Sequence, residues 1–220
     1  MAENIAEEMA ASSPKDVTRR WRKPRQARSL ARVNRILDVA EKMFIEAGYG
    51  SATTKAIAAQ AEVPIGTLYQ FFPDKAAILQ ALAERYSELL QQRFQAFYTD
   101  EMARCPLVEY VSTITEGVDQ FFSDYPGYYA IFMEVQSVLP EVEDATDSEL
   151  IQNMAKLFMK RDSSLKSEDY EAIAFVTVKA MGNLQWLSLG QPPQFRQRLV
   201  EEVKRLTFHY FQSYFPETPD

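Results

Sequence analysis

The apolar residues of this chain recur with the period of an α-helix over most of its length. They fall three and four positions apart, and no segment alternates apolar and polar residues convincingly, as a half-buried strand does. We therefore expect an all-α fold of about nine helices. The pattern predicts them over residues 28–47, 54–61, 64–72, 75–97, 106–124, 127–138, 146–163, 168–189 and 194–215.

Glycine, proline and capping residues mark the expected helix ends. Gly48 can end the first helix in a left-handed conformation, and Thr53 or Thr54 can cap the second. Pro64 suits the first turn of the third helix, and Asp74 can cap the fourth. The later breaks are expected at residues 126–127, 140–147, 163–167 and 190–193.

The first three helices have the lengths and spacing of a helix-turn-helix unit. In that motif the second short helix enters the major groove of DNA and the first crosses the backbone. At about 100° per residue, the third helix carries apolar residues on one face and an uncharged polar face opposite. The apolar face holds Ile65, Leu68, Phe71 and Phe72, and the polar face holds Gly66, Thr67, Tyr69 and Gln70.

This polar face is suited to reading a duplex. The amide of Gln70 can bond to adenine, Thr67 can touch base edges, and the hydroxyl of Tyr69 can reach a phosphate. A surface that binds another protein remains open as the alternative.

Charge is distributed unevenly along the chain. The formal net charge is −7, but residues 1–75 carry +3 and residues 76–220 carry −10. Residues 12–35 hold nine Lys and Arg against the single Asp16, while residues 1–27 lack apolar periodicity. The N-terminal stretch is either an arm that binds a polyanion or a solvated tail. We expect residues 1–27 to form a flexible basic arm.

One set of N-terminal residues stands out by its order and spacing. It consists of Ile36, Leu37, Ala40, Phe44, Gly48, Tyr49, Thr53, Thr54, Ile57, Ala58, Ala61, residues 63–75, Ile78 and Leu79. This set resembles the signature of the TetR family of tetracycline-repressor-like transcriptional regulators. The resemblance implies a homodimer that binds a palindromic operator as a repressor and leaves it when a small molecule enters the C-terminal domain. It divides the chain into a helix-turn-helix domain at residues 28–75 and a ligand-binding and dimerisation domain at 76–220.

The resemblance also implies which residues contact DNA. Carried over by position, these are Thr54, Lys55, Ile65, Gly66, Thr67, Tyr69, Gln70 and Lys75. By analogy with other N-terminal arms, Arg25, Arg28 and Arg32 are expected to lay the arm along the backbone or a minor groove. Two residues depart from the family pattern. Glu62 stands where glycine is usual, and a left-handed glutamate costs about 1 kcal/mol. Pro64 replaces a Ser-type cap.

The C-terminal part is rich in aromatic and methionine side chains, which either pack a core or line a pocket for a small apolar or aromatic effector. The candidates are Phe122, Tyr125, Tyr128, Tyr129, Phe132, Met133, Met154, Phe158, Phe175, Met181, Gln185 and Trp186.

The last two helices are expected to pair with their copies in a homodimer, or else to close their own core. The candidate contacts are Ala174, Val178, Ala180, Gly182, Trp186, Leu199, Val203, Leu206, Tyr210 and Phe211.

Other classes of protein lack support in the sequence. No Gly-rich phosphate loop, nucleophile elbow or zinc-protease motif is present, so we expect no enzyme and no cofactor. One cysteine, Cys105, and one histidine, His209, leave no set of ligands for a structural zinc. The longest uncharged run, residues 180–195, is too short and polar to span a bilayer, so a cytoplasmic protein is expected. An all-α ligand-binding or adaptor protein without DNA activity is the remaining alternative.

Overall fold

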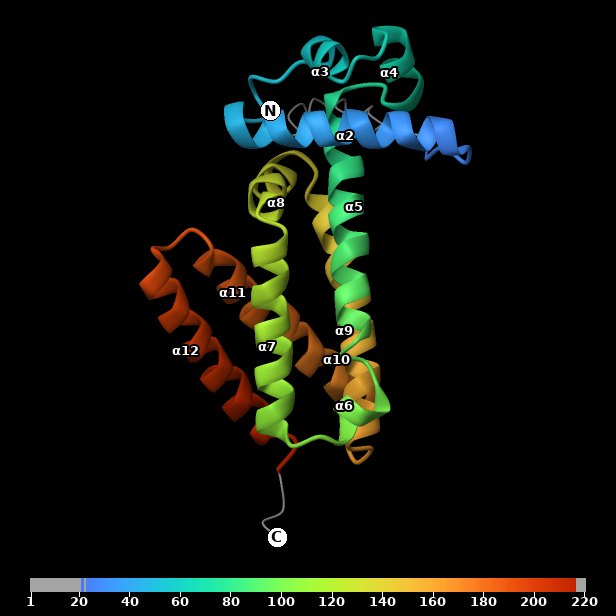
Figure 1. Ribbon diagram of the computed structural model, residues 1–220. Helices are drawn as coiled ribbons and strands as arrows, with labels where there is room; N and C mark the ends of the chain where they lie inside the picture. The colour runs from blue at the N-terminus through green and yellow to red at the C-terminus, as the bar shows by residue number, and fades with distance from the viewer. Residues whose placement is uncertain (1–20, 22, 217–220) are drawn as a thin grey trace, which may run out of the picture.

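Helices account for all the regular secondary structure that the computed structural model describes, at residues 21 and 23–216 (Figure 1). Of residues 141–146 only the backbone is described. The expectation of an all-α fold is confirmed. Among the described residues, no helix combines the length and the apolar character needed to cross a membrane.

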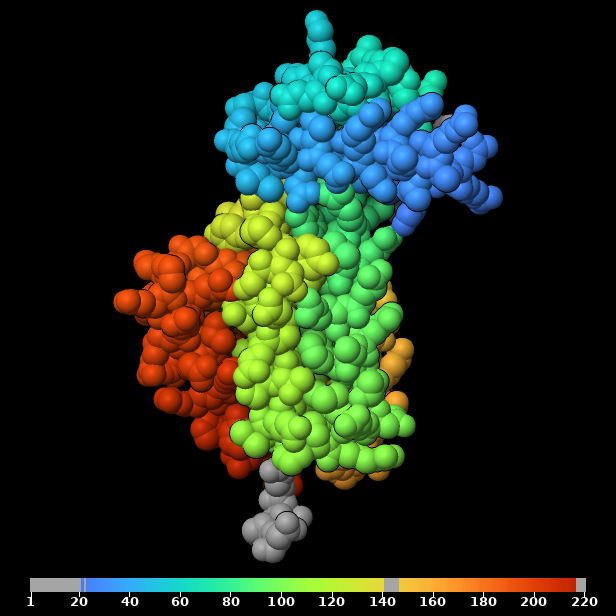
Figure 2. All heavy atoms as spheres, viewed as in Figure 1, coloured from blue at the N-terminus to red at the C-terminus, as the bar shows by residue number. Residues whose placement is uncertain are grey.

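The N-terminal unit forms a head at one end of the molecule (Figure 2). Its three helices are α2 (Ala27–Ala47), α3 (Thr54–Gln60) and α4 (Ile65–Phe71). Helix α5 (Lys75–Gln95) starts in this unit and runs without a break into the rest of the molecule (Figure 1). The apolar stripe of α2 faces the core through Val33, Ile36, Leu37, Ala40 and Phe44.

Side-chain caps and one strained residue determine the turns of this unit. Thr53 accepts a hydrogen bond from the Ala56 amide at 3.1 Å, and Asp74 accepts one from the Ala77 amide at 2.8 Å. Both capping predictions are confirmed. Pro64 is the N-cap of α4 and not its first helical residue, so that prediction was wrong by one position. Glu62 is left-handed, with φ of 53°.

The remaining helices form the larger body of the molecule. Helices α7 and α8 lie beside α5, and α12 packs against α7 at the flank (Figure 1). The bounds are α6 (Asp100–Arg104), α7 (Leu107–Asp124), α8 (Gly127–Val138), α9 (Pro140–Arg161), α10 (Ser167–Val176), α11 (Asn183–Ser188) and α12 (Pro193–Gln212).

Three features of this body differ from the sequence-based expectation. The short helix α6 was not predicted. The break expected at 140–147 is helical, because Pro140 occupies the first turn of α9, where its missing N–H is no loss, and acidic residues suit the N-terminal part of a helix. The helix expected at 168–189 contains a π-helical turn, η1 (Thr177–Gly182).

The arm predicted over residues 1–27 is mostly outside the described residues, including Lys15, Arg19, Arg20 and Arg22. Its described end is not free. The Trp21 ring stacks on Phe72, with centroids 5.7 Å apart, and its indole N–H donates to Glu84 at 2.9 Å. The partly buried indole of Trp21 thus packs against the head and has a hydrogen-bond partner there, while flexibility of the arm stays a prediction.

Candidate nucleic-acid interface and ligand cavity

The face of α4 that points away from the core of the head carries the residues predicted to contact DNA. Gly66, Tyr69 and Gln70 are exposed and Thr67 is half-buried, whereas Leu68 and Phe72 on the opposite face are fully buried. Ile65 is 41% exposed, so its assignment to the apolar face was wrong and it lies beside the polar residues. We call Ile65, Gly66, Thr67, Tyr69 and Gln70 the outer ridge of α4.

The outer ridge has room for a close partner and is joined to α3. A Cβ atom added at Gly66 would meet no other atom within 4 Å. The hydroxyls of Tyr69 and Thr54 lie 3.0 Å apart, which links the ridge to the first turn of α3. Lys55 is exposed next to Thr54. The two short helices thus present one continuous polar surface without a carboxylate among these residues.

Lys75 does not lie as expected. Its ammonium donates to the backbone carbonyls of Tyr49, Gly50 and Ala52 at 2.5, 3.3 and 3.0 Å, and it sits 4.1 Å from the centre of the Tyr49 ring. An ammonium has three N–H donors, and all three have acceptors here. The Lys75 ammonium therefore supports the turn after α2, and a phosphate contact by this lysine stays a prediction.

Arginines are gathered at the start of α2. Arg25, Arg28 and Arg32 are all exposed, and the first turn of α2 holds no acidic residue. These guanidinium groups are available for a polyanion.

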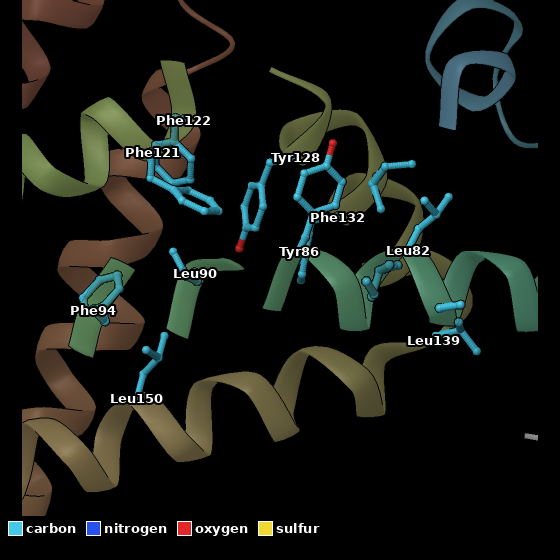
Figure 3. Close-up of a cluster of buried hydrophobic side chains, with 14 of the residues drawn as sticks. Leu82, Tyr86, Leu90, Phe94, Phe121, Phe122, Tyr128, Phe132, Leu139 and Leu150 are labelled. Atoms are coloured by element: carbon cyan, nitrogen blue, oxygen red, sulfur yellow. The ribbon is translucent and has the colours of Figure 1, made fainter. Parts of the chain in front are cut away.

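A cavity of about 260 Å³ opens in the body of the molecule, among α5, α7, α8, α9, η1, α11 and α12. Figure 3 shows part of the aromatic and aliphatic cluster around it, with Phe94, Phe122, Tyr128 and Leu150 coming from four different helices. The predicted ligand residues that line this cavity are Phe122, Tyr128, Phe132, Met154, Met181, Gln185 and Trp186.

The other predicted ligand residues do not line it. Met133 and Phe175 point to the surface, being 45% and 53% exposed. Phe158 is fully buried in a separate aromatic cluster with Tyr110, Phe211 and Phe215. Two tyrosines pack just outside the cavity wall. The ring centroid of Tyr125 lies 4.9 Å from that of Phe121, and the ring centroid of Tyr129 lies 5.3 Å from that of Trp186.

The cavity wall also contains polar groups, of which the sequence pattern indicated Gln185 but not the Asp147–Lys179 pair. Asp147 and Lys179 form an ion pair at 2.6 Å, and Gln185 donates to the Thr115 carbonyl at 2.7 Å. The indole N–H of Trp186 is buried with no hydrogen-bond partner in the described part of the chain. Asp147 lies where the break expected at 140–147 overlaps the helix predicted over 146–163, and the structure places it within α9, facing η1.

A compact junction joins the head to the body. The Glu41 carboxylate on α2 accepts short hydrogen bonds from the Arg85 guanidinium and the Tyr86 hydroxyl, both on α5. Arg85 also pairs with Asp38 at 2.6 Å. Burial, and then the Glu41 hydrogen bond, raise the pKa of Tyr86, so its hydroxyl stays protonated and donates.

The last helices leave an apolar face uncovered. The exposed side chains are Phe175, Val176, Leu184, Leu187, Phe195 and Leu206. Of the contacts expected there, Leu206 is 48% exposed, but Ala174 and Phe211 are fully buried within their own subunit. Val178, Gly182, Trp186 and Val203 line the cavity. Ala174 and Phe211 therefore agree with the alternative that these helices close their own core, and the homodimer contacts stay a prediction.

Two family models match separate parts of the chain. Residues 36–82 match the family model described as "Bacterial regulatory proteins, tetR family", and residues 106–211 match "Tetracyclin repressor-like, C-terminal domain".

Curated relatives match only the N-terminal part. The transcriptional repressor KstR of Rhodococcus jostii is 36% identical over 62 residues, which is 28% of this chain and 29% of KstR. The regulator UidR of Escherichia coli is 39% identical over 61 residues, which is 28% of this chain and 31% of UidR. The match thus spans about a third of either relative.

A solved structure extends the likeness to the whole fold. A TetR-family regulator from Pectobacterium atrosepticum aligns with a TM-score of 0.66 at 16% identity, covering 89% of this chain and all of that one. The family consists of DNA-binding regulators and not of enzymes, in agreement with the sequence-based expectation. This chain belongs to the TetR family of helix-turn-helix transcriptional regulators.

Proposed function

We propose that this regulator is a homodimeric repressor that leaves a palindromic operator when a small apolar or aromatic molecule occupies the cavity. The observation that carries the DNA-binding role is the outer ridge of α4, which is uncharged, polar and exposed opposite the buried Leu68 and Phe72. In this proposal residues 28–75 bind DNA, and residues 76–220 bind the effector and the partner subunit.

Each DNA contact has a distinct role in this proposal. Gln70 and Thr67 read base edges, and Gly66 and Ile65 allow the helix to approach the groove closely. Tyr69, Thr54 and Lys55 contact phosphates, as do Arg25, Arg28 and Arg32 from the start of α2.

A dimer is needed because a palindromic operator presents two half-sites about 34–36 Å apart, one helical turn along the duplex. The uncovered apolar face on α10, α11 and α12 supports an interface there, since such a face is costly to leave in water. We assign the contacts to Phe175, Leu184, Leu187 and Leu206 and not to the buried Ala174 and Phe211.

The cavity supports a compact effector. An engineered apolar cavity of about 150 Å³ holds benzene, so a cavity of about 260 Å³ suits a molecule of one or two substituted rings. Asp147 and Lys179 neutralise one another, which favours an uncharged ligand, and an acceptor atom on that ligand would satisfy the Trp186 indole.

The test begins with selection of bound sequences from random duplex DNA. We then expect Gln70→Ala to weaken operator binding by about 1–3 kcal/mol and to relax the preference at one base pair of each half-site. Fluorescence anisotropy with single-base operator variants measures both effects. Gln197→Ala, at an exposed position of α12, is the matched control and should change neither.

An adaptor without DNA activity gives a different result. A regulator that contacts several phosphates loses affinity steeply as salt rises, with a negative log–log slope. If selection enriches no sequence and duplex binding is flat with salt, the DNA-binding role of the ridge is wrong.

A further inference from the structure

The first turn of α8 comes close to α2 and α5 at Gly127. A Cβ atom at Gly127 would lie 2.5 Å from the Tyr86 hydroxyl oxygen, 2.7 Å from a Glu41 carboxylate oxygen and 3.0 Å from Ile45. Such distances are shorter than non-bonded contacts allow. The head and the body are therefore in close contact here, around a single carboxylate.

Glu41 contacts both helices that lead into the body. It accepts from Arg85 and Tyr86 of α5, and its carboxylate lies against the N-terminal turn of α8, where the helix dipole favours negative charge. The Glu41 side chain is only 21% exposed, so water competes weakly for these bonds.

The same contacts continue to the cavity wall. The ring of Tyr86 meets the ring of Tyr128 edge to face, with centroids 5.7 Å apart and planes at 87°. Tyr128 stacks on Phe132 at 4.3 Å, and both of these rings line the cavity (Figure 3). Two tyrosines thus connect the cavity with Glu41 on the DNA-binding unit.

We propose that Tyr128, Tyr86 and Glu41 communicate occupancy of the cavity to the head. A ligand seated against Tyr128 displaces its ring, the Tyr86 hydroxyl moves with it, and the hydrogen bond to Glu41 weakens. Helix α2 is then free to turn relative to α8, which carries the outer ridge away from the geometry that fits DNA. This inference rests on the proposed function, because it concerns regulation by the same cavity.

The proposed communication couples the affinity of the cavity for its ligand to the affinity of the head for DNA, and it does not set either affinity alone. A ligand shifts a conformational equilibrium only by its differential affinity for the two states, and the effect is reciprocal between the two sites. Spatial continuity by itself does not establish coupling, so the test must measure each ligand's affinity in the presence of the other.

The test uses the full chain, its selected operator, and 6-propionyl-2-(dimethylamino)naphthalene, a neutral probe of two fused rings whose fluorescence rises in apolar surroundings. For the wild type we expect saturating operator to weaken probe binding by about tenfold, within the usual range of coupling between sites. For Glu41→Gln we expect less than about a twofold effect, with the separate affinities for probe and operator each within about threefold of wild type.

Two further variants make the result specific. Glu46→Gln removes an equal charge from the same helix, at an exposed pair with Lys42, and should retain the full coupling. Tyr86→Phe keeps the ring and removes only the hydroxyl, and it should also abolish most of the coupling. Thermal denaturation monitored by circular dichroism shows whether Glu41→Gln is folded. If Glu41→Gln is unfolded, the Tyr86→Phe variant alone tests the proposed communication.

The outcomes separate this inference from the proposed function. Full coupling in both Glu41→Gln and Tyr86→Phe overturns the proposed communication and leaves the ligand-responsive regulator intact. A wild type that binds operator normally but shows no mutual effect with the probe overturns the ligand-responsive release and the communication together, while the DNA-binding role stands.

Discussion

The head and the body of this molecule bury side chains in different proportions. The head packs mainly small and aliphatic residues, including Ala40, Ile57, Ala61 and Leu68, each fully buried, beside the rings of Phe44 and Phe72. The body packs aromatic rings, as in the cluster of Tyr110, Phe158, Phe211 and Phe215. Small residues allow short helices to approach closely, whereas large rings leave shaped spaces where they do not meet.

This difference shows how one chain can hold the outer ridge of the head in a fixed position and still leave a cavity in the body. In the head, the position of the outer ridge depends on turns held by Thr53, Asp74 and Lys75. In the body, one aromatic cluster is fully packed and another surrounds the cavity. Both parts of the comparison can be tested by substitution.

The largest effect is expected from Phe158→Ala in the packed cluster. Removing a fully buried ring that contacts Phe211 and Phe215 should lower the free energy of unfolding by about 3–5 kcal/mol. Urea denaturation followed by circular dichroism measures this change. Met159→Ala, on the exposed side of the same helix, should cost less than about 0.5 kcal/mol. A loss below about 1 kcal/mol for Phe158→Ala would mean that this cluster is not tightly packed.

A smaller effect is expected from Lys75→Met in the head. This change leaves three turn carbonyls without their charged donor, so the free energy of unfolding should fall by about 2 kcal/mol. The exposed Lys42→Met should cost under about 0.5 kcal/mol.

Lys75→Met also tests whether this lysine contacts DNA. Operator binding measured over a range of salt should keep its wild-type slope, since loss of a phosphate contact lowers the slope by about one. A decrease of about one in the slope would show that Lys75 contacts a phosphate of the operator.

The smallest effect is expected at the turn before α4. Glu62 has φ of 53°, which an L-residue adopts at a cost, so Glu62→Gly should stabilise the chain by roughly 0.5–1 kcal/mol after the entropy of glycine is subtracted. Glu62→Ala removes the same charge and keeps the strain, so it should give no such gain. Equal melting temperatures for all three proteins would argue against strain at this turn.

The head was largely predictable because its signals are local. The caps at Thr53 and Asp74, the stripe of α2 and the left-handed Glu62 each depend on residues within a few positions. The role of Lys75 was not predictable in this way. Its partners lie more than twenty positions earlier in the chain, and only folding brings their carbonyls to its ammonium.

The sequence predicted which types of residue line the cavity, but not which individual residues do so. Phe132 and Phe158 are equally apolar and both buried, yet one lines the cavity and the other fills a core, a distinction that depends on how several helices meet. Phe175 is different, because its helix held a usable signal. Tyr170, Ile173 and Ala174 define the buried stripe of α10, and Phe175 falls off it.

The π-helical turn η1 makes the cavity sensitive to the number of residues in its wall. A turn closed by i→i+5 bonds accommodates one residue more than an α-helical turn, and each residue rotates the next part of the helix by about 100°. A chain shorter by one residue between 177 and 182 would present a different side of α11 to the interior, and Gln185 and Trp186 would no longer face the cavity. The number of residues in this segment therefore determines which side chains of α11 line the cavity.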